Sequence, residues 1–225
     1  MKLLRNAFLI LMISSVFMSC TFVKHDGSST SKNDDGVSFY FEDESFDAVE
    51  YVHGIWDDQV LGTFKEEARE LEALLNGLRT DPEKTKEAYG IRKEELSPYT
   101  FIVSGRIPIK EVNRESSAGL LVLDILDLSE ESNCTIQIGP VIKKSMVRDA
   151  LEFIKFDDFN NQIEFANISR EINFYIRDNI VPSVDDSWKP GMVVDFLGAF
   201  TLFDGSEEVM ITPVQLELCS GDANE

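Results

Sequence analysis

The stretch IQIGPVIKKSMVRDALEFI, residues 136–154, changes its periodicity halfway along. Ile136 and Ile138 alternate with polar residues, as in a strand, and Gly139-Pro140 ends that pattern. The apolar residues that follow recur at helical spacing: Val147, Ala150, Leu151 and Ile154. The stretch therefore predicts a strand followed by a helix, and Ser145 is the expected N-cap of that helix.

Strands are predicted on both sides of this helix. Alternating apolar residues indicate three strands before it and two after it: 99–109, 121–125, 134–138, 194–202 and 209–218. In the last strand the alternation changes phase at Pro213, which predicts a β-bulge there. Three strands, a helix and two strands is the order of the OB-fold, a five-stranded barrel. We therefore predict an α+β protein with an OB-fold-like antiparallel barrel; a generic antiparallel α+β sheet is the alternative.

The residues before the barrel have helical patterns. Asp47 is placed to cap the first helix, and a run of apolar residues three or four apart predicts a second helix through residues 60–78. Asp81-Pro82 has the sequence of another helix start, and Gly90 ends that helix. Residues 45–90 are therefore expected to be helical.

The N-terminus has the organisation of a secretory signal. Two basic residues precede an apolar run from Ala7 to Met18, which is too short to span a bilayer. Ser19-Cys20 follows, and a cysteine directly after the cleavage site is typical of the bacterial lipobox, although Phe17 stands where that motif usually has Leu. We expect residues 1–19 to be a lipoprotein signal peptide and Cys20 to be lipidated. A plain secretory signal with an incidental Cys20 is the alternative.

Four segments make up the predicted domain organisation. After the signal peptide of residues 1–19, residues 20–44 are predicted to be a flexible tether, because residues 24–38 are polar and rich in Gly and Ser. Residues 45–96 form the helical extension, and residues 97–219 form the OB-fold-like barrel domain. The mature chain is long enough for one sizeable core.

The charge balance argues against a nucleic-acid ligand. The chain has 41 Asp and Glu residues against 21 Lys and Arg, a net charge of −20, and neither half contains a basic stripe. Neutralisation of phosphates supplies most nucleic-acid affinity. The second and third strands of the barrel, LLVLDIL and CTIQI, also lack the aromatic residues on which bases stack. We expect no binding of nucleic acid.

No catalytic or metal-binding pattern is present in the sequence. The two histidines, His25 and His53, are far apart, and no HExxH, CxxC, GxSxG or phosphate-loop motif occurs. We therefore predict no catalytic residues, no metal and no cofactor, and we expect the protein not to be an enzyme. An envelope hydrolase that uses carboxylates is the least favoured hypothesis.

The bend FNNQIEF, residues 159–165, is the most unusual stretch. Its donors and acceptors suit the hydroxyls of a sugar, and the candidate ligand-binding residues in it are Asn160, Asn161, Gln162 and Glu164. The alternative is that these side chains cap helix ends and satisfy backbone groups in the bend. Arg114, in the loop between the first two strands, is a further candidate because OB-fold barrels use that loop to bind ligands.

Two cysteines lie within the barrel domain. Cys134 begins the third strand and Cys219 follows the end of the fifth. These strands run parallel in an OB-fold, so the start of one and the end of the other lie at opposite edges, roughly 20 Å or more apart. A disulfide needs α-carbons within about 7 Å. We therefore predict two free thiols.

The chain resembles an uncharacterised bacterial family of predicted periplasmic lipoproteins. The stretches that carry the resemblance are FDAVEYVHGIWD (46–57), SPYTFIVSGRI (97–107), EVNRESSAGLLVLDI (111–125), IQIGPVI (136–142), RDALEFIKFDDFNNQIEFANISREIN (148–173), GAFTL (198–202) and ITPVQLE (211–217). The resemblance implies a lipid-anchored OB-like domain with a helical extension. It also implies an association with sugar-type ABC importers, but it supplies no activity.

Together these observations predict a lipid-anchored binding or accessory module facing the periplasm. Its expected partners are the membrane, through the N-terminal lipid, and an envelope protein or transporter. An OB-fold nucleic-acid-binding lipoprotein is the alternative function.

Overall fold

The computed structural model describes residues 46–125, 134–203 and 208–219, which belong to a single unit, Ser45–Glu225. The predicted signal peptide and the whole of the predicted tether, with Cys20 and His25, lie outside the described residues. Within the described ranges, no helix is both long enough and apolar enough to cross a membrane.

The described chain begins with three consecutive helical segments. They are α2 (Ala48–Ile55), the π-helical turn η2 (Trp56–Val60) and α3 (Leu61–Glu67). As predicted, the Asp47 carboxylate caps α2, because it accepts hydrogen bonds from the backbone N–H groups of Val49 and Glu50 at 2.9 and 3.1 Å. The rings of Phe46 and Tyr51 pack across this first turn, with centroids 5.5 Å apart.

The prediction of one unbroken helix through residues 60–78 is wrong. α3 ends at Glu67, and the short strand β1 (Arg69–Glu70) pairs in parallel with Val103 and Ser104. Pairing with the barrel replaces the helical hydrogen bonds that are lost at this break. The apolar spacing resumes after β1, so the sequence pattern did not reveal the interruption.

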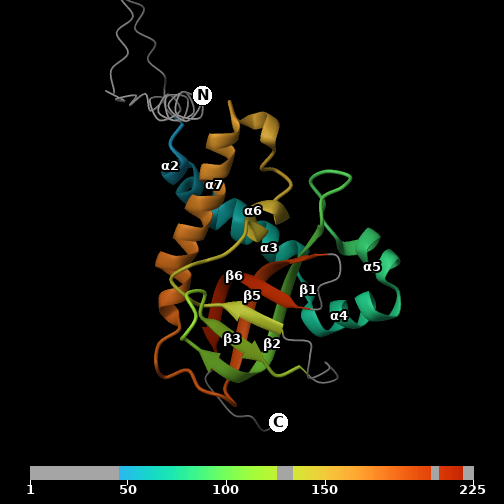
Figure 1. Ribbon diagram of the computed structural model, residues 1–225, viewed down its shortest axis with the longest axis vertical. Coiled ribbons are helices and arrows are strands. Elements are labelled where there is room, and N and C mark those ends of the chain that lie inside the picture. The colour runs from blue at the N-terminus through green and yellow to red at the C-terminus, as the bar shows by residue number, and fades with distance from the viewer. Residues whose placement is uncertain (1–45, 126–133, 204–207, 220–225) are drawn as a thin grey trace, which may run out of the picture. The chain divides into compact units, whose positions relative to one another are not determined.

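Two more helices complete the extension. The Glu70 carboxylate caps α4 (Leu71–Thr80) by accepting hydrogen bonds from two backbone N–H groups of its first turn. α5 (Pro82–Tyr89) begins after the Asp81 cap and ends at Gly90, as the sequence predicted. In Figure 1, α4 and α5 lie beside β1 at the edge of the barrel.

Five strands close into a barrel. They are β2 (Tyr99–Asn113), β3 (Leu120–Leu123), β4 (Cys134–Gln137), β5 (Val193–Leu202) and β6 (Val209–Leu218). Their order is β2-β3-β4-β6-β5, and the pairing of β2 with β5 closes the circle. β4 and β6 are parallel, while the other barrel pairs are antiparallel. The predicted OB-fold-like barrel is confirmed.

The predicted bulge in the last strand is confirmed. Gly198 pairs with Pro213 and the preceding Leu197 pairs with Gln215, so Val214 is the additional residue on β6. A second irregularity lies in β2, where the register against β3 shifts between Ile109 and Glu111. Each bulge bends its strand, as closure of a small barrel requires.

The segment between β4 and β5 is largely helical. It contains α6 (Met146–Ala150), the 3-10 turn η3 (Phe156–Asp158), α7 (Gln162–Tyr175), the π-helical turn η4 (Ile176–Ile180) and the 3-10 turn η5 (Val181–Ser183). α6 packs against β2, β5 and β6 and buries Met146, Val147 and Ala150. α7 lies alongside α2 (Figure 1).

Two details of α6 differ from the prediction. The helical spacing extends to Ile154, but α6 ends at Ala150 and the chain turns there. Ser145 is the N-cap by position, yet its hydroxyl donates to the Asp149 carboxylate at 2.7 Å instead of capping the backbone. The Ser145 hydroxyl therefore bonds the charged carboxylate one turn away and not the backbone N–H groups that it was predicted to cap.

Both barrel cysteines are free, as predicted. Cys134 is buried and pairs with Val209 at the start of the parallel β4–β6 ladder, whereas Cys219 follows the end of β6 and is half-buried. Burial raises the pKa of the Cys134 thiol to about 12. Cys134 is thus a small apolar core residue.

Candidate functional site

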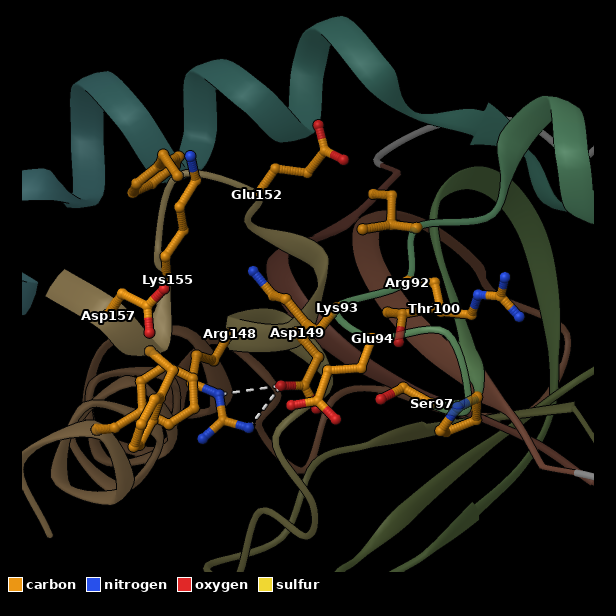
Figure 2. A pocket seen from close by; sticks show the side chains of 15 residues that line it. Arg92, Lys93, Glu94, Ser97, Thr100, Arg148, Asp149, Glu152, Lys155 and Asp157 are labelled. Carbon is orange, nitrogen blue, oxygen red and sulfur yellow. Dashed lines mark hydrogen bonds and ion pairs between the residues drawn. The ribbon is translucent and has the colours of Figure 1, made fainter. Parts of the chain in front are cut away.

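A cleft of about 930 Å³ lies where the helical extension meets the insertion between β4 and β5. One wall is the segment from Ile91 to Thr100, which leads from α5 into β2. The other wall runs from Arg148 to Asp157, and Phe165 of α7 completes the lining. Figure 2 shows Lys93, Arg148 and Asp149 in the middle of the cleft, with Glu152 and Lys155 above them in that view.

A backbone bridge holds the first wall in place. Ile91 and Thr100 exchange two hydrogen bonds, with N–O distances of 2.8 and 2.9 Å, so the residues between them form a closed loop. The buried Thr100 hydroxyl also hydrogen-bonds the hydroxyl of Thr201 on β5 at 2.9 Å. The loop is therefore tied to the barrel, and it presents Lys93 and Ser97 to the cleft.

Lys93 links the two walls. Its half-buried ammonium donates to the backbone carbonyl of Leu151 and, at 3.0 Å, to that of Ile154. Burial lowers the pKa of Lys93 below its ordinary value, and the neighbouring Asp149 carboxylate partly opposes that shift. The two carbonyls fix the charge of this lysine at the centre of the cleft.

Arg148 and Asp149 form a compact ionic group on the second wall. The guanidinium donates to one Asp149 oxygen through Nε at 2.9 Å and Nη2 at 2.6 Å, and the Ser145 hydroxyl donates to the other oxygen. The guanidinium also lies over the ring of Phe165, 4.2 Å from its centroid. Both oxygens of Asp149 therefore already accept hydrogen bonds from neighbouring side chains, which makes Asp149 a weak candidate for ligand contact.

Aromatic rings line the end of the cleft near α7. Phe156 and Phe165 meet edge to face with centroids 5.4 Å apart, and Phe159 packs against Phe165 at 5.7 Å. Phe156 is 46% exposed, which leaves part of its ring free for an apolar contact. Phe153 adds a third ring to the lining of the cleft.

The cleft differs in charge from the rest of the chain. It contains equal numbers of positive and negative side chains, four of each, in a protein with 41 acidic and 21 basic residues. Glu94, Glu152, Lys155 and Asp157 make no side-chain hydrogen bond or ion pair with any described residue. These charges remain available for a ligand.

Three of the predicted ligand-binding residues do come together, but they use their polar groups locally. The Asn161 side chain caps α7 by accepting hydrogen bonds from the N–H groups of Ile163 and Glu164 at 2.9 and 3.0 Å. The Glu164 carboxylate accepts from the backbone N–H and side-chain amide of Asn160. These are the contacts of the capping alternative, and a ligand role for the three residues stays a prediction. Gln162, in the first turn of α7, is exposed.

Arg114 lies in the β2–β3 loop and contacts a different part of the chain. Its guanidinium donates to the backbone carbonyls of Val184 at 3.1 Å and Asp185 at 2.8 Å, and it lies 4.0 Å from the Asp186 carboxylate. These bonds fix the loop against the segment that follows η5. The structure gives Arg114 a bracing role, and its predicted ligand role stays a prediction.

The usual ligand face of an OB-fold, on β3 and β4, is covered in this protein. Gln137 at the end of β4 is fully buried. Its amide donates to the Lys143 carbonyl and the Thr212 hydroxyl, and its carbonyl accepts from the Lys143 N–H at 2.7 Å. Gly139 lies so close to Ala118 in the β2–β3 loop that a Cβ there would overlap the Ala118 backbone. The segment after β4 therefore occupies this part of the barrel surface.

Sequence reasoning missed the cleft because no motif marks it. Its two walls are about 50 residues apart in the sequence, and each is an ordinary mixture of charged and aromatic residues. The only usable signal was the phenylalanine-rich stretch from Phe153 to Phe165. Among the described residues, no three His, Cys, Asp or Glu side chains are arranged to hold a metal ion.

Comparison with known proteins agrees with the fold and identifies the family. The chain is similar to a crystal structure of an OB-fold protein from Thermotoga maritima, with 18% identity and a TM-score of 0.66 over 78% of this chain and 100% of that one. At this identity the likeness shows the fold alone. No curated protein matches the sequence. The profile of a family described as "Predicted periplasmic lipoprotein (DUF2291)" matches residues 10–217. The chain therefore belongs to the DUF2291 family of predicted periplasmic lipoproteins, a description that supports a lipid-anchored location in the bacterial cell envelope.

Proposed function

We propose that this protein is a non-enzymatic binding or accessory module of the envelope that serves carbohydrate uptake, with the cleft as its ligand site. The cleft itself is the observation that carries the proposal. Its volume of about 930 Å³ is in the range of small-molecule sites. It combines an exposed face of Phe156 with the carboxylates of Glu94, Glu152 and Asp157 and the ammonium of Lys155, which have no hydrogen-bond or ion-pair partner among the described residues. Rings that contact C–H groups, and ionic groups that bond hydroxyls, suit a sugar.

Nucleic acid is the alternative ligand, and two observations weigh against it. The barrel face that OB-folds use for oligonucleotides is covered after β4, and the described residues of β3 and β4 include no aromatic side chain. The four cations of the cleft are matched by four carboxylates, so the cleft is not the positively charged groove that a phosphate backbone needs. The proposal therefore places the ligand in the cleft and gives the barrel a supporting role.

Crosslinking in intact cells tests the accessory role. A photoreactive amino acid at Glu94, on the exposed rim of the cleft, should capture a subunit of a sugar importer when the cells grow on the imported sugar. The matched control is the same substitution at Glu111, an exposed residue of β2 that does not line the cleft. Equal capture from both positions, or capture of other proteins only, would contradict the proposal.

We also propose that Cys20 is the acylated residue. Cys20→Ser should leave the precursor uncleaved or release the protein into the soluble fraction, because two or more acyl chains hold a protein on a bilayer where one scarcely does. Fractionation and mass spectrometry of the mature N-terminus check this. An unmodified N-terminus at another residue would show that the signal is a plain secretory one.

A further inference from the structure

The position of Lys93 has a consequence for the ligand. An ammonium has three N–H donors, and Lys93 uses two of them on the carbonyls of Leu151 and Ile154. The third has no acceptor among the described residues, and Lys93 lines the cleft. A charge held in this way loses little side-chain entropy when a ligand binds, because the side chain is already ordered.

The charges around Lys93 leave this part of the cleft with a net positive charge. Asp149 is the carboxylate that acts most strongly on Lys93, but both its oxygens accept hydrogen bonds from Arg148 or Ser145. The guanidinium of Arg148 adds a second positive charge, and only part of its fork is used. The charges that act on Lys93 are two carboxylates, Asp149 and Glu152, and two cations, Arg148 and Lys155, so that this group including Lys93 has three cations for two carboxylates.

We propose that the cleft binds an acidic sugar and that the carboxylate of this sugar accepts a hydrogen bond from the ammonium of Lys93. The inference rests on the proposed function, because it names the ligand class of the same cleft. The uronate carboxylate pairs with Lys93, and the hydroxyls of the ring reach the rim carboxylates Glu94 and Asp157. The exposed ring of Phe156 covers one face of the sugar. A neutral sugar makes the contacts with the rim carboxylates and with Phe156 but lacks the carboxylate that pairs with Lys93.

A purely structural role for Lys93 is the competing explanation. In that case the ammonium only ties Ile91–Thr100 to the carbonyls of the second wall, and its loss lowers stability without any effect on ligand preference. The two explanations differ in the affinity ratio between an acid sugar and its neutral counterpart, which a structural tie does not change.

Isothermal titration of the full chain in detergent micelles measures that ratio. Glucuronate and glucose differ only at C6, as do galacturonate and galactose, so each pair isolates the carboxylate. We expect one uronate to bind about 10- to 100-fold more tightly than its neutral partner, because a charge-assisted hydrogen bond distinguishes them. Raising the salt concentration should weaken binding of the uronate and leave the neutral sugar unchanged.

Two variants of Lys93 separate charge from structure. Lys93→Gln keeps amide N–H donors for the two carbonyls but removes the charge, and it should abolish the preference for the acid. Lys93→Arg keeps the charge and should retain most of the preference for the acid sugar. Lys110→Met, which removes an exposed charge on β2 outside the cleft, is the matched control and should bind as the wild type does.

The outcomes distinguish the two proposals. If an acid sugar and its neutral counterpart bind equally well in the wild type, the acidic-sugar inference is wrong and sugar binding in the cleft stands. If none of the four sugars binds, both proposals are overturned. If a thermal unfolding curve shows that Lys93→Gln is folded, and the variant still binds the acid sugar more tightly than the neutral one, Lys93 has only a structural role and the inference fails.

Discussion

The cleft and the β3–β4 face of the barrel differ in how their polar groups are used. On the barrel face, the amide of Gln137 spends both its N–H donors and its carbonyl on Lys143 and Thr212, so it has little left for a ligand. In the cleft, the Lys93 ammonium and the rim carboxylates Glu94 and Asp157 retain bonding capacity. The polar groups of the face that usually binds ligands in an OB-fold are thus more completely hydrogen-bonded within the protein than those of the cleft. The fold alone therefore does not determine where the ligand site lies.

The difference has a physical origin in the segment after β4. In this protein the chain from Gly139 to Lys144 folds back on the β2–β3 loop before it enters α6, and the hydrogen bond from the Val141 N–H to the Ser117 carbonyl holds it there. The same path brings α6 and the residues after it against the helical extension. One route of the chain therefore closes the usual face and builds the second wall of the cleft.

The largest expected effect comes from breaking this closure at Gly139. In Gly139→Ala the new Cβ would overlap the backbone of Ala118 and Gly119, which cannot move as a flexible side chain can. We expect a loss of about 3 kcal/mol or more in the free energy of unfolding. Denaturant unfolding measures it. If the variant keeps wild-type stability, the face is not closed as described.

Gly62→Ala is the matched control for this substitution. Gly62 lies in α3, and a Cβ there would have no heavy atom within 4 Å. Alanine should therefore stabilise the helix by about 0.5–1 kcal/mol through its higher helix propensity. The changes in the free energy of unfolding should have opposite signs in the two variants. Gly139→Ala is then destabilising because of the close backbone approach at that position, and not because any added methyl group destabilises the protein.

The second effect concerns the buried amide on the covered face. Gln137→Leu removes the acceptor of the part-buried Lys143 N–H and one partner of the buried Thr212 hydroxyl, which still donates to the Met146 sulfur. We expect a cost of about 2–3 kcal/mol in the free energy of unfolding, and no change in ligand affinity at the cleft. Chemical unfolding and titration on the same preparation check both. Reduced sugar binding would mean that the two regions are coupled.

The sequence predicted the barrel because each of its elements agrees with a local pattern. Strand alternation, the Asp47 and Asp81 caps and the phase change at Pro213 are properties of neighbouring residues, and all of them are found in the structure. β1 was missed because its pairing with Val103 depends on a residue far away in the sequence. The helical spacing on either side of Arg69 gave no sign of it.

The candidate site was less predictable than the fold. The amide-rich bend was found because its residues are adjacent, and the structure shows Asn161 capping α7. The cleft was not found, because the meeting of Lys93 with the carbonyls of Leu151 and Ile154 depends on how the extension packs against the insertion. Backbone carbonyls leave no mark in a sequence. Nothing in the sequence therefore distinguished Lys93 from the other charged residues around it.

A third effect tests the burial of β4 through the pH dependence of stability. Burial raises the pKa of Cys134 to about 12, whereas the pKa of a cysteine in an unfolded chain is about 8.5. The stabilising contribution is fully present below the unfolded pKa and is lost as pH rises toward the folded pKa, because only the unfolded chain releases the proton. At pH 10 the loss is about 2 kcal/mol.

Unfolding of wild type and Cys134→Ala between pH 8 and pH 10.5 isolates this contribution from the tyrosines and lysines that titrate in the same range. The loss of stability with pH should be shallower in Cys134→Ala. Cys219→Ala keeps the thiol of Cys134 and should behave as the wild type does. Parallel curves for wild type and Cys134→Ala would mean that solvent reaches β4.

The smallest effect decides between capping and ligand binding at the edge of the cleft. Asn161→Ala removes the side chain that accepts hydrogen bonds from Ile163 and Glu164, and it should cost about 1 kcal/mol of stability. Asn161→Ser restores a capping oxygen but not the amide, so it should recover most of that loss. If Asn161 is only a cap, both variants bind the preferred sugar as the wild type does, once compared at temperatures where each is folded. If the amide contacts the ligand, Asn161→Ser is stable but binds weakly. Titration of these two variants therefore shows whether the cleft extends into the amide-rich bend or ends at Phe165.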